Sequence, residues 1–282
     1  MTTCVAPPES VEFTAHNIRL NDGTFTKPDE QYTMDSHPWF LSAKGVLTSL
    51  FPQNREDIRV ADLGCLEGGY ALEFARLGFD SVGIEVRESN IAACRYVKEQ
   101  CGLPNLTYIK DDAWNVGDHG PFDAVFCCGL LYHIDRPRKF IETMAQATKK
   151  VLILQTHFAV DDFYARSKFL RPLRNLFSKV LGRTDKFKLS ELCEHEGLMG
   201  RWFAEFNSEP TEEAREAARW HSWKNHRSFW IQREYLLQAV QEAGFDLVFE
   251  QFDSLRPSIS ESMLNGYYHT DLRGTFVGIR ND

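Results

Sequence analysis

Two histidines follow adjacent predicted strands and could remove a proton from a hydroxyl group. His133 comes after the strand predicted at residues 122–128, and His157 comes after the strand predicted at residues 150–156. Because the carboxyl ends of parallel strands meet at one edge of a sheet, both side chains are expected there. Histidine has an unperturbed pKa near neutrality, which suits a general base. The alternatives are that His133 caps the helix expected at Asp135 and that His157 bonds only to loop carbonyls.

The stretch GCLEG at residues 64–68 is a glycine-rich turn between a predicted strand and a predicted helix, and Asp62 lies directly before it. The backbone N–H groups of such a turn predict a nucleotide-like ligand at the sheet edge. A dinucleotide fingerprint needs a middle glycine for close approach to a pyrophosphate, but Leu66 occupies that place. The turn therefore disfavours NAD and FAD. It favours S-adenosylmethionine, whose positive sulfonium and ammonium groups would explain the acid at Asp62.

Short apolar runs alternate with helical patterns from Ile58 onward. This alternation predicts an α/β fold with a largely parallel, Rossmann-like sheet that is covered by helices on both faces. The predicted strands are residues 58–63, 81–86, 106–110, 122–128, 150–156, 245–252 and 275–280.

The helices between these strands have recognisable ends. The first runs from Gly68 to Gly78 and the second from Ser89 to Gly102, and both closing glycines suit left-handed caps. A third helix crosses from the fourth strand to the fifth and ends in the basic pair at residues 149–150, whose charges suit a helix C-terminus. Further helices are expected after Pro38 and over residues 233–244.

Residues 158–230 interrupt this alternation and are predicted to form a helical, tryptophan-rich cap insertion. Four of the six tryptophans lie in it: Trp202, Trp220, Trp223 and Trp230. They either extend the core or line a pocket. The chain then divides into an N-terminal helical lid segment at 1–57, an S-adenosylmethionine-binding core at 58–157, the cap insertion, and the C-terminal part of the core sheet at 231–282.

Within the insertion, residues 163–189 hold eight basic side chains against one acid, and apolar residues recur there at helical spacing. Such a face is most often a solvated surface. The other readings are a contact with a membrane surface and a site for an anionic acceptor, including RNA.

The overall composition favours a small-molecule partner. The 32 Lys and Arg residues against 40 Asp and Glu give a net charge of −8, which disfavours nucleic acid. The seven cysteines form no CxxC pair, so neither disulfides nor a zinc site are indicated, and a cytoplasmic location fits. No leader-like start or membrane span of about 18 apolar residues is visible. The histidines lack HxxxH or HxH spacing, so no required metal is expected.

Four motifs in order resemble those of the class I S-adenosylmethionine-dependent methyltransferases, over residues 58–156 and 233–280: ADLGCLEGG, GIEVR, KDDAW and CCGLLYHI. The resemblance implies the seven-stranded class I sheet, S-adenosylhomocysteine as product, and a cofactor held at Asp62, Gly64, Cys65, Leu66 and Gly68. It further implies that Glu85 accepts hydrogen bonds from both ribose hydroxyls, that Asp112 binds the adenine amino group, that Ala113 lies beside the ring, and that Cys128 belongs to the segment under the cofactor. Taken singly, Glu85 could be a solvated acid and Asp112 a helix cap.

The stretches CLEGG, GLLYH, QTHF and WKNHRSFW also resemble a bacterial group that includes nodulation-factor fucose O-methyltransferases and, more distantly, the tRNA wobble-uridine carboxymethyltransferase. This implies in-line methyl transfer to a hydroxyl of a small or sugar-like acceptor, with a histidine base. The acceptor pocket is expected to use Trp39, Trp220, His221, Trp223, Tyr267 and Tyr268. The alternatives are an RNA methyltransferase, an N- or C-methyltransferase of an anionic metabolite, and a non-catalytic S-adenosylmethionine-binding module.

Overall fold

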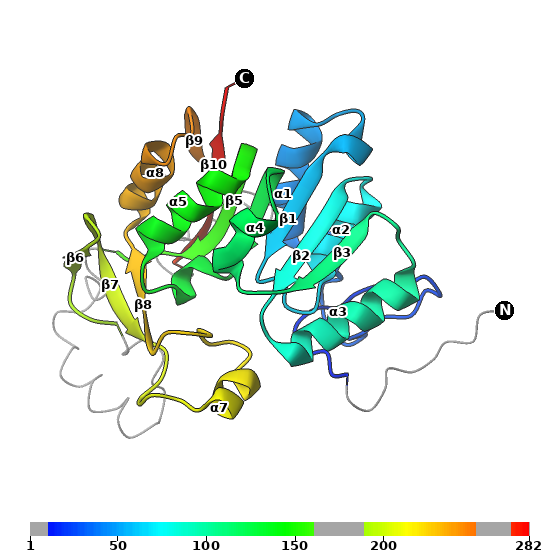
Figure 1. The fold of residues 1–282 in the computed structure, drawn as a ribbon, viewed down its shortest axis with the longest axis horizontal. Helices are drawn as coiled ribbons and strands as arrows, with labels where there is room; N and C mark the ends of the chain where they lie inside the picture. Colours follow the sequence, from blue (N-terminus) through cyan, green and yellow to red (C-terminus); the bar gives the residue numbers. More distant parts are fainter. Residues whose placement is uncertain (1–10, 161–188, 252–271, 282) are drawn as a thin grey trace.

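The structure is a computed structural model that describes residues 11–160, 189–251 and 272–281. Its centre is a seven-stranded sheet with the strand order β3-β2-β1-β4-β5-β10-β9 (Figure 1). The strands are β1 (Arg59–Leu63), β2 (Asp80–Glu85), β3 (Leu106–Lys110), β4 (Phe122–Cys128), β5 (Thr148–His157), β9 (Leu247–Gln251) and β10 (Arg273–Ile279). The α/β fold and all seven predicted strands are confirmed; β3 and β4 have the predicted bounds, and the ends of the other strands differ from the predictions by at most two residues.

The pairing of the strands places the candidate chemistry at one edge of the sheet. β1 pairs in parallel with β2 and with β4, and β4 pairs in parallel with β5. β10 runs antiparallel to both of its neighbours, β5 and β9. The carboxyl ends of the parallel strands and the amino end of β10 therefore meet at the same edge, where open α/β sheets bind ligands.

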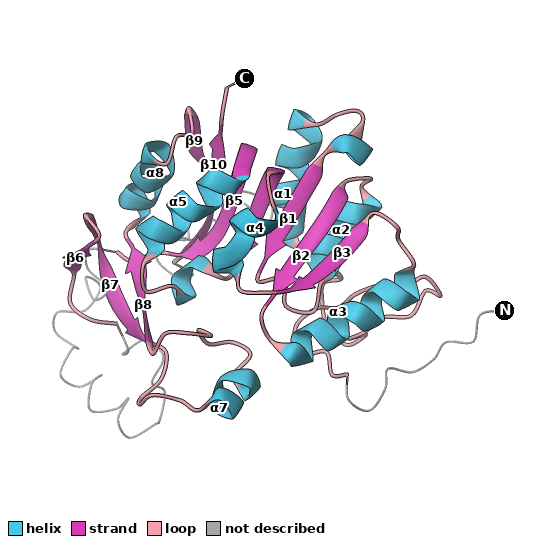
Figure 2. Cartoon of the chain, viewed as in Figure 1, coloured by secondary structure: helices cyan, strands magenta, loops and turns pink. Residues whose placement is uncertain are grey.

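Helices cover both faces of the sheet, as Figure 2 shows, and each face has its own apolar core. On one face the buried side chains come from α1 (Pro38–Leu50), α2 (Gly69–Arg76) and α3 (Glu88–Cys101). On the other they come from α4 (Val116–His119), α5 (Pro137–Ala147) and α8 (Arg233–Glu242). The inner strands β1, β2, β4 and β5 are buried along most of their length because both of their faces are covered, whereas the edge strand β3 is more exposed.

The helix ends show which sequence signals decide the boundaries. Gly78 and Gly102 have φ angles of +97° and +61° and follow α2 and α3, as predicted. The prediction that the third helix ends in Lys149 and Lys150 is wrong, because α5 stops at Ala147 and both lysines lie in β5. Pairing of β5 with β4 already begins at Thr148, opposite Phe122, so these residues belong to the strand.

The described part of the insertion differs from the helical cap that the sequence predicted. Strands β6 (Cys193–His195), β7 (Leu198–Ala204) and β8 (Arg227–Ile231) form a separate antiparallel sheet in the order β6-β7-β8. Its described helix is the short α7 (Glu212–Ala217) between β7 and β8. We call residues 189–231 the cap. The basic stretch at 163–189 lies outside the described residues, apart from its last position.

Candidate cofactor and acceptor site

A cavity of about 480 Å³ lies at the carboxyl edge of the sheet. It is lined by the N-terminal segment (residues 11–37) with Trp39, the turn after β1, the residues at or just after the ends of β2, β3 and β4, residues 219–225 of the cap, and Arg273 at the start of β10. Of the residues predicted for the site, the cavity is lined by Trp39, Gly64, Leu66, Glu85, Asp112, Ala113, Cys128, His133, Trp220, His221 and Trp223. The structure therefore brings together most of the predicted cofactor and acceptor residues.

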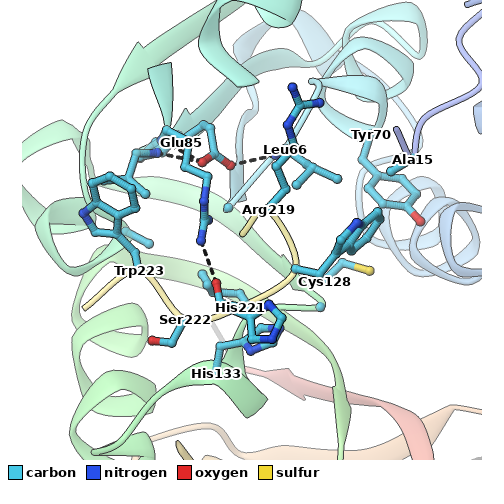
Figure 3. A pocket seen from close by; sticks show the side chains of 18 of the residues that line it. Ala15, Leu66, Tyr70, Glu85, Cys128, His133, Arg219, His221, Ser222 and Trp223 are labelled. Carbon is cyan, nitrogen blue, oxygen red and sulfur yellow. Dashed lines mark hydrogen bonds between the residues drawn. The ribbon is translucent and has the colours of Figure 1, made fainter. Parts of the chain in front are cut away.

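Glu85 ends β2 with its carboxylate at the cavity (Figure 3). Its Oε2 accepts a hydrogen bond from Leu66 N at 3.0 Å, and its Oε1 accepts from Val86 N and Arg87 N at 3.0 and 2.9 Å. Burial raises the pKa of this carboxyl, while the N–H donors oppose the rise. Because Oε2 receives one of these bonds and Oε1 two, the carboxylate keeps acceptor capacity for hydroxyl groups in the cavity.

The turn after β1 has a left-handed backbone at the position where leucine replaces the usual glycine. Leu66 has a φ angle of +52°, which strains a side chain that glycine would lack. Gly64 and Gly68 are also left-handed, at +64° and +81°. Gly68 has a second constraint, since a Cβ there would lie 2.5 Å from the Tyr108 hydroxyl, which donates to Gly68 O. The turn is therefore left-handed at Leu66 as well as at its two glycines, although leucine is a large residue for this backbone.

Three of the predicted cofactor residues lie behind the cavity wall. Asp62, Cys65 and Gly68 do not line the cavity. Asp62 is 1% exposed and accepts a hydrogen bond from Ala71 N at 3.1 Å, in the first turn of α2. Burial raises its pKa to about 8, despite that bond. These residues therefore support the turn from the side that faces away from the cavity.

Asp112 has the helix-capping role that was one of the two alternatives for it. Its Oδ1 accepts from Trp114 N at 3.0 Å and so caps the short helix that begins at Ala113. Its Oδ2 lies 2.9 Å from Nζ of Lys224 in the cap. Asp112 and Ala113 both line the cavity, so the position remains available to an adenine ring.

Glu67 attaches the N-terminal segment to the turn, a role that the sequence reasoning missed. Its carboxylate is fully buried and accepts from Thr14 N, Ala15 N and His16 N at 2.5, 3.1 and 2.7 Å, and from the Thr14 hydroxyl at 2.9 Å. His16 Nδ1 then accepts from Gly69 N at 3.0 Å. Thr14, Ala15 and His16 all line the cavity. The motif ADLGCLEGG already contained a sign of this role, because an acid such as Glu67 in a buried turn needs donors from elsewhere in the chain.

His133 lines the cavity and is held by an acid from the cap that the sequence reasoning also missed. Its Nδ1 lies 2.8 Å from Oε1 of Glu205, which is 1% exposed. Glu205 also accepts from the Ser228 hydroxyl and from Ser222 N. Burial alone would raise the pKa of Glu205, but the bonds from His133 and Ser228 outweigh it and lower the pKa. An ionised Glu205 places the proton of neutral His133 on Nδ1, which leaves Nε2 as the basic nitrogen.

His157, the second predicted base, lies outside the cavity lining. Its ring stacks on Trp230 with centroids 4.9 Å apart, and its Nδ1 lies 3.3 Å from Leu272 O. This matches the alternative that it bonds to a loop carbonyl. Tyr267 and Tyr268 lie outside the described residues.

The tryptophans of the insertion divide between core and cavity. Trp202 packs against the core beside Phe229, with ring centroids 5.1 Å apart, and Trp230 donates its Nε1 to Tyr132 O. Trp220 and Trp223 line the cavity, and Trp220 is 58% exposed. Both predicted alternatives therefore hold, each for two of the tryptophans.

Arg87 connects this cap region to the end of β2. Its guanidinium donates to the carbonyl oxygens of Arg215, Ala218 and His221, the last at 2.6 Å (Figure 3). It also lies 5.4 Å from the centroid of the Trp223 ring. Arg87, two residues after Glu85, thus fixes the backbone that presents the cap side chains.

The described residues contain neither a cluster suited to a metal ion nor a helix suited to span a membrane. Over residues 11–160, 189–251 and 272–281, no group of three or more His, Cys, Asp and Glu side chains is placed to hold a metal ion. No helix within these ranges is long and apolar enough to span a membrane.

The fold and the cavity together define the class of protein. The strand order, the antiparallel β10 beside β5, and a buried carboxylate at the end of β2 match the class I S-adenosylmethionine-dependent methyltransferases. The residues present fit that cofactor, because Glu85 offers free acceptor capacity and the turn after β1 opens to the same cavity. A model of the methyltransferase domain matches residues 40–250, and the chain belongs to this family of S-adenosylmethionine-dependent enzymes.

Similar solved structures agree on the fold. The N-terminal domain of EvdMO1, crystallised in the presence of S-adenosylhomocysteine and D-fucose, gives a TM-score of 0.60 at 22% identity. The match covers 92% of this chain and 88% of that one. The same domain with S-adenosylhomocysteine bound gives a TM-score of 0.59 at 22% identity, covering 87% of this chain and 82% of that one.

Curated relatives match over a little more than a third of the chain. The ubiquinone biosynthesis O-methyltransferase of Roseobacter denitrificans is 32% identical over 99 residues, which cover 35% of this chain and 40% of that protein. The O-antigen chain terminator bifunctional methyltransferase/kinase of Escherichia coli is 27% identical over 122 residues, covering 38% of this chain and 16% of that protein. The chain therefore spans less than half the length of these relatives.

Proposed function

We propose that the protein transfers a methyl group from S-adenosylmethionine to a hydroxyl of a small or sugar-like acceptor, with His133 as the general base. The observation that carries the proposal is the pair formed by His133 and Glu205 at the cavity, joined over 2.8 Å. A hydroxyl is a poor nucleophile until its proton is removed, whereas an unprotonated amine attacks through its lone pair without such a base. An oriented histidine therefore favours an oxygen acceptor.

The chain's own residues supply binding, orientation and proton removal. Glu85 would accept the ribose hydroxyls and Asp112 would lie at the adenine, and the bound cofactor supplies an electrophilic methyl group. His133 Nε2 takes the acceptor proton while Glu205 stabilises the resulting imidazolium, and His133 afterwards releases that proton to solvent. Trp220, His221 and Trp223 shape the acceptor side, and the cap excludes bulk water, so the acceptor is held in line.

The names of the relatives support an oxygen acceptor. The ubiquinone biosynthesis enzymes are O-methyltransferases, and the EvdMO1 domain was crystallised in the presence of a sugar, D-fucose. A second candidate, modification of RNA, has no supporting observation in the described residues.

The test measures transfer of labelled methyl groups to a panel of hydroxylated sugars and phenols. Replacement His133→Ala should lower turnover about 100-fold to 10,000-fold while affinity for S-adenosylhomocysteine persists. His157→Ala is the matched control and should keep turnover within a few fold, because His157 does not line the cavity. Normal turnover of His133→Ala, or labelling of amines in preference to hydroxyls, would remove the proposal.

Glu205→Gln distinguishes positioning from mere support of the fold. Because an ionised carboxylate stabilises imidazolium, its loss should weaken proton removal by His133 and lower turnover, while affinity for S-adenosylhomocysteine persists. A parallel loss of that affinity would point to a structural effect.

A further inference from the structure

Arg273 places a guanidinium group at the acceptor side of the cavity. It is the first residue of β10, opposite His157 in the register of β5, and it lines the cavity. Its guanidinium carbon lies 3.8 Å from the ring centroid of Trp39 and 5.5 Å from that of Tyr132. Its Nε donates to Oε1 of the fully buried Gln155 at 2.8 Å. The side chain is therefore fixed between two aromatic rings.

The charge of Arg273 has no acidic partner within hydrogen-bonding or ion-pair distance among the residues that the structure describes. The other basic residues of the cavity are differently placed: Lys27 pairs with Glu30, Lys224 with Asp112 and Arg219 with Glu12 and Glu67, while Arg87 bonds to three carbonyls and lies near Glu85. Of the five N–H donors of Arg273, the one on Nε has an acceptor within the same ranges. Its remaining donors are available to a ligand.

A guanidinium held in this way is suited to an oxyanion. Its planar fork matches the oxygens of a carboxylate or a phosphate, and stacking on Trp39 removes water from its faces. A partly desolvated cation without a counter-charge is costly, so an anion from the ligand would be favoured.

Arg273 and the proposed base share a neighbour. The centroid of the Tyr132 ring lies 4.2 Å from that of the His133 ring and 5.5 Å from the guanidinium carbon of Arg273. Both groups therefore lie beside the same aromatic ring, so a small acceptor can reach both of them with its hydroxyl and its oxyanion.

We propose that the acceptor is a small anionic hydroxy compound, whose carboxylate or phosphate is held by Arg273 while a hydroxyl meets His133. This rests on the proposed function for the identity of the hydroxyl. The oxyanion contact is independent of turnover and can be measured alone.

The experiment titrates benzoate, phenyl phosphate and neutral benzamide into full-length protein saturated with S-adenosylhomocysteine, by calorimetry. Wild type should bind at least one of the two anions and prefer it to benzamide, and the preferred anion identifies the acceptor group. Arg273→Gln should weaken that binding by about 10-fold or more, and Arg273→Lys should weaken it less. Thermal melting of both variants checks that they fold.

Two controls separate this contact from others. Arg219→Gln removes the same charge from the same cavity and should keep anion affinity, because Arg219 already faces Glu12 and Glu67. Affinity for S-adenosylhomocysteine should be unchanged in Arg273→Gln. A parallel loss of that affinity would mean that Arg273 holds the cofactor's own carboxylate and would overturn the proposal. The proposal would also be overturned if wild type bound neither anion, if Arg273→Gln bound the anion as tightly as wild type, or if Arg219→Gln lost as much anion affinity as Arg273→Gln. Failure of the proposed function would instead appear as normal turnover in His133→Ala.

Discussion

Glu85 supports the cofactor turn and faces the cavity with the same carboxylate. Its oxygens accept three backbone N–H bonds, one of them from Leu66, whose φ angle of +52° is costly for a leucine. Glu85 thus helps to hold the strained turn at Leu66 in place. Loss of this residue should affect both the ligand and the turn.

Replacement Glu85→Ala is expected to weaken S-adenosylhomocysteine binding by at least 10-fold in calorimetry. Each charge-assisted hydrogen bond to a ribose hydroxyl contributes about 1.5–3 kcal/mol, so two lost bonds exceed that factor. The matched control is Glu88→Ala, which removes an exposed acid three residues later that pairs with Lys110 and Arg95. Equal affinity of the Glu85 and Glu88 variants would contradict the assignment.

At this scale, strand position was the useful signal in the sequence. Glu85 was predicted from its place at the end of a strand, and Asp112 and His133 from their places after two others; all three line the cavity. Glu67 and Glu205 were missed because their partners lie 51 to 53 and 72 residues away, at distances that local pattern cannot reveal. Asp62 and Cys65 share a motif with Leu66 but do not line the cavity, because Asp62 accepts from Ala71 N in α2 and Cys65 contacts Cys94 in α3.

Among the elements, the N-terminal segment depends on one buried side chain. Glu67 satisfies the backbone N–H groups of three consecutive residues, Thr14 to His16, all of which line the cavity. Without that carboxylate the donors would be buried without acceptors, at about 1–3 kcal/mol each. The segment would be expected to separate from the turn and expose the cavity.

Glu67→Ala should therefore make residues 11–37 susceptible to limited proteolysis and lower the affinity for S-adenosylhomocysteine. Mass spectrometry of the first fragments locates the cuts. Glu12→Ala changes an acid of the same segment whose side chain is 76% exposed, and it should leave both readouts unchanged. Resistance to protease in the Glu67 variant would show that other contacts hold the segment.

The elements of the core were predictable, whereas those of the cap were not. Strands β1 to β5 are apolar runs between helices with clear caps, and their period survives in the sequence. Strands β7 and β8, with the sequences LMGRWFA and RSFWI, are short, rich in aromatic residues and joined by a long connection, so they lack turn signals. The sheet they form is set by packing against the core, where Phe229 is 1% exposed.

Over the whole molecule, two buried groups with opposite behaviour shape the dependence of stability on pH. Burial lowers the pKa of His16 from 6.5 to about 4, so the unfolded chain binds more protons and stability falls as pH decreases through that range. Burial raises the pKa of Asp62 from 3.8 to about 8, so the folded chain holds its proton longer and stability falls as pH increases through that range. Of these two groups, only Asp62 still changes the stability with pH above pH 6.5, up to about pH 8.

Asp62→Asn should become more stable relative to wild type as pH rises from about 4 to 8, and the difference should level off above 8. An asparagine oxygen can still accept from Ala71 N, but it carries no charge to bury. The slope corresponds to about 1.4 kcal/mol for each pKa unit that separates the folded and unfolded states. Urea unfolding at several pH values measures it, and a constant difference across the range would contradict the raised pKa.

The place of β10 in the sheet governs the order in which a growing polypeptide can be completed. β10 lies between β5 and β9, yet it is the last of these strands to be synthesised. Until residues 273–279 have left the ribosome, β5 has an open edge and β9 has no partner in this sheet. The nascent chain can therefore assemble β1, β2 and β4, with the cofactor turn, before the strand that begins with Arg273 exists. Translation thus makes the part of the cavity formed by β1, β2 and β4 first and delivers the guanidinium of Arg273 last.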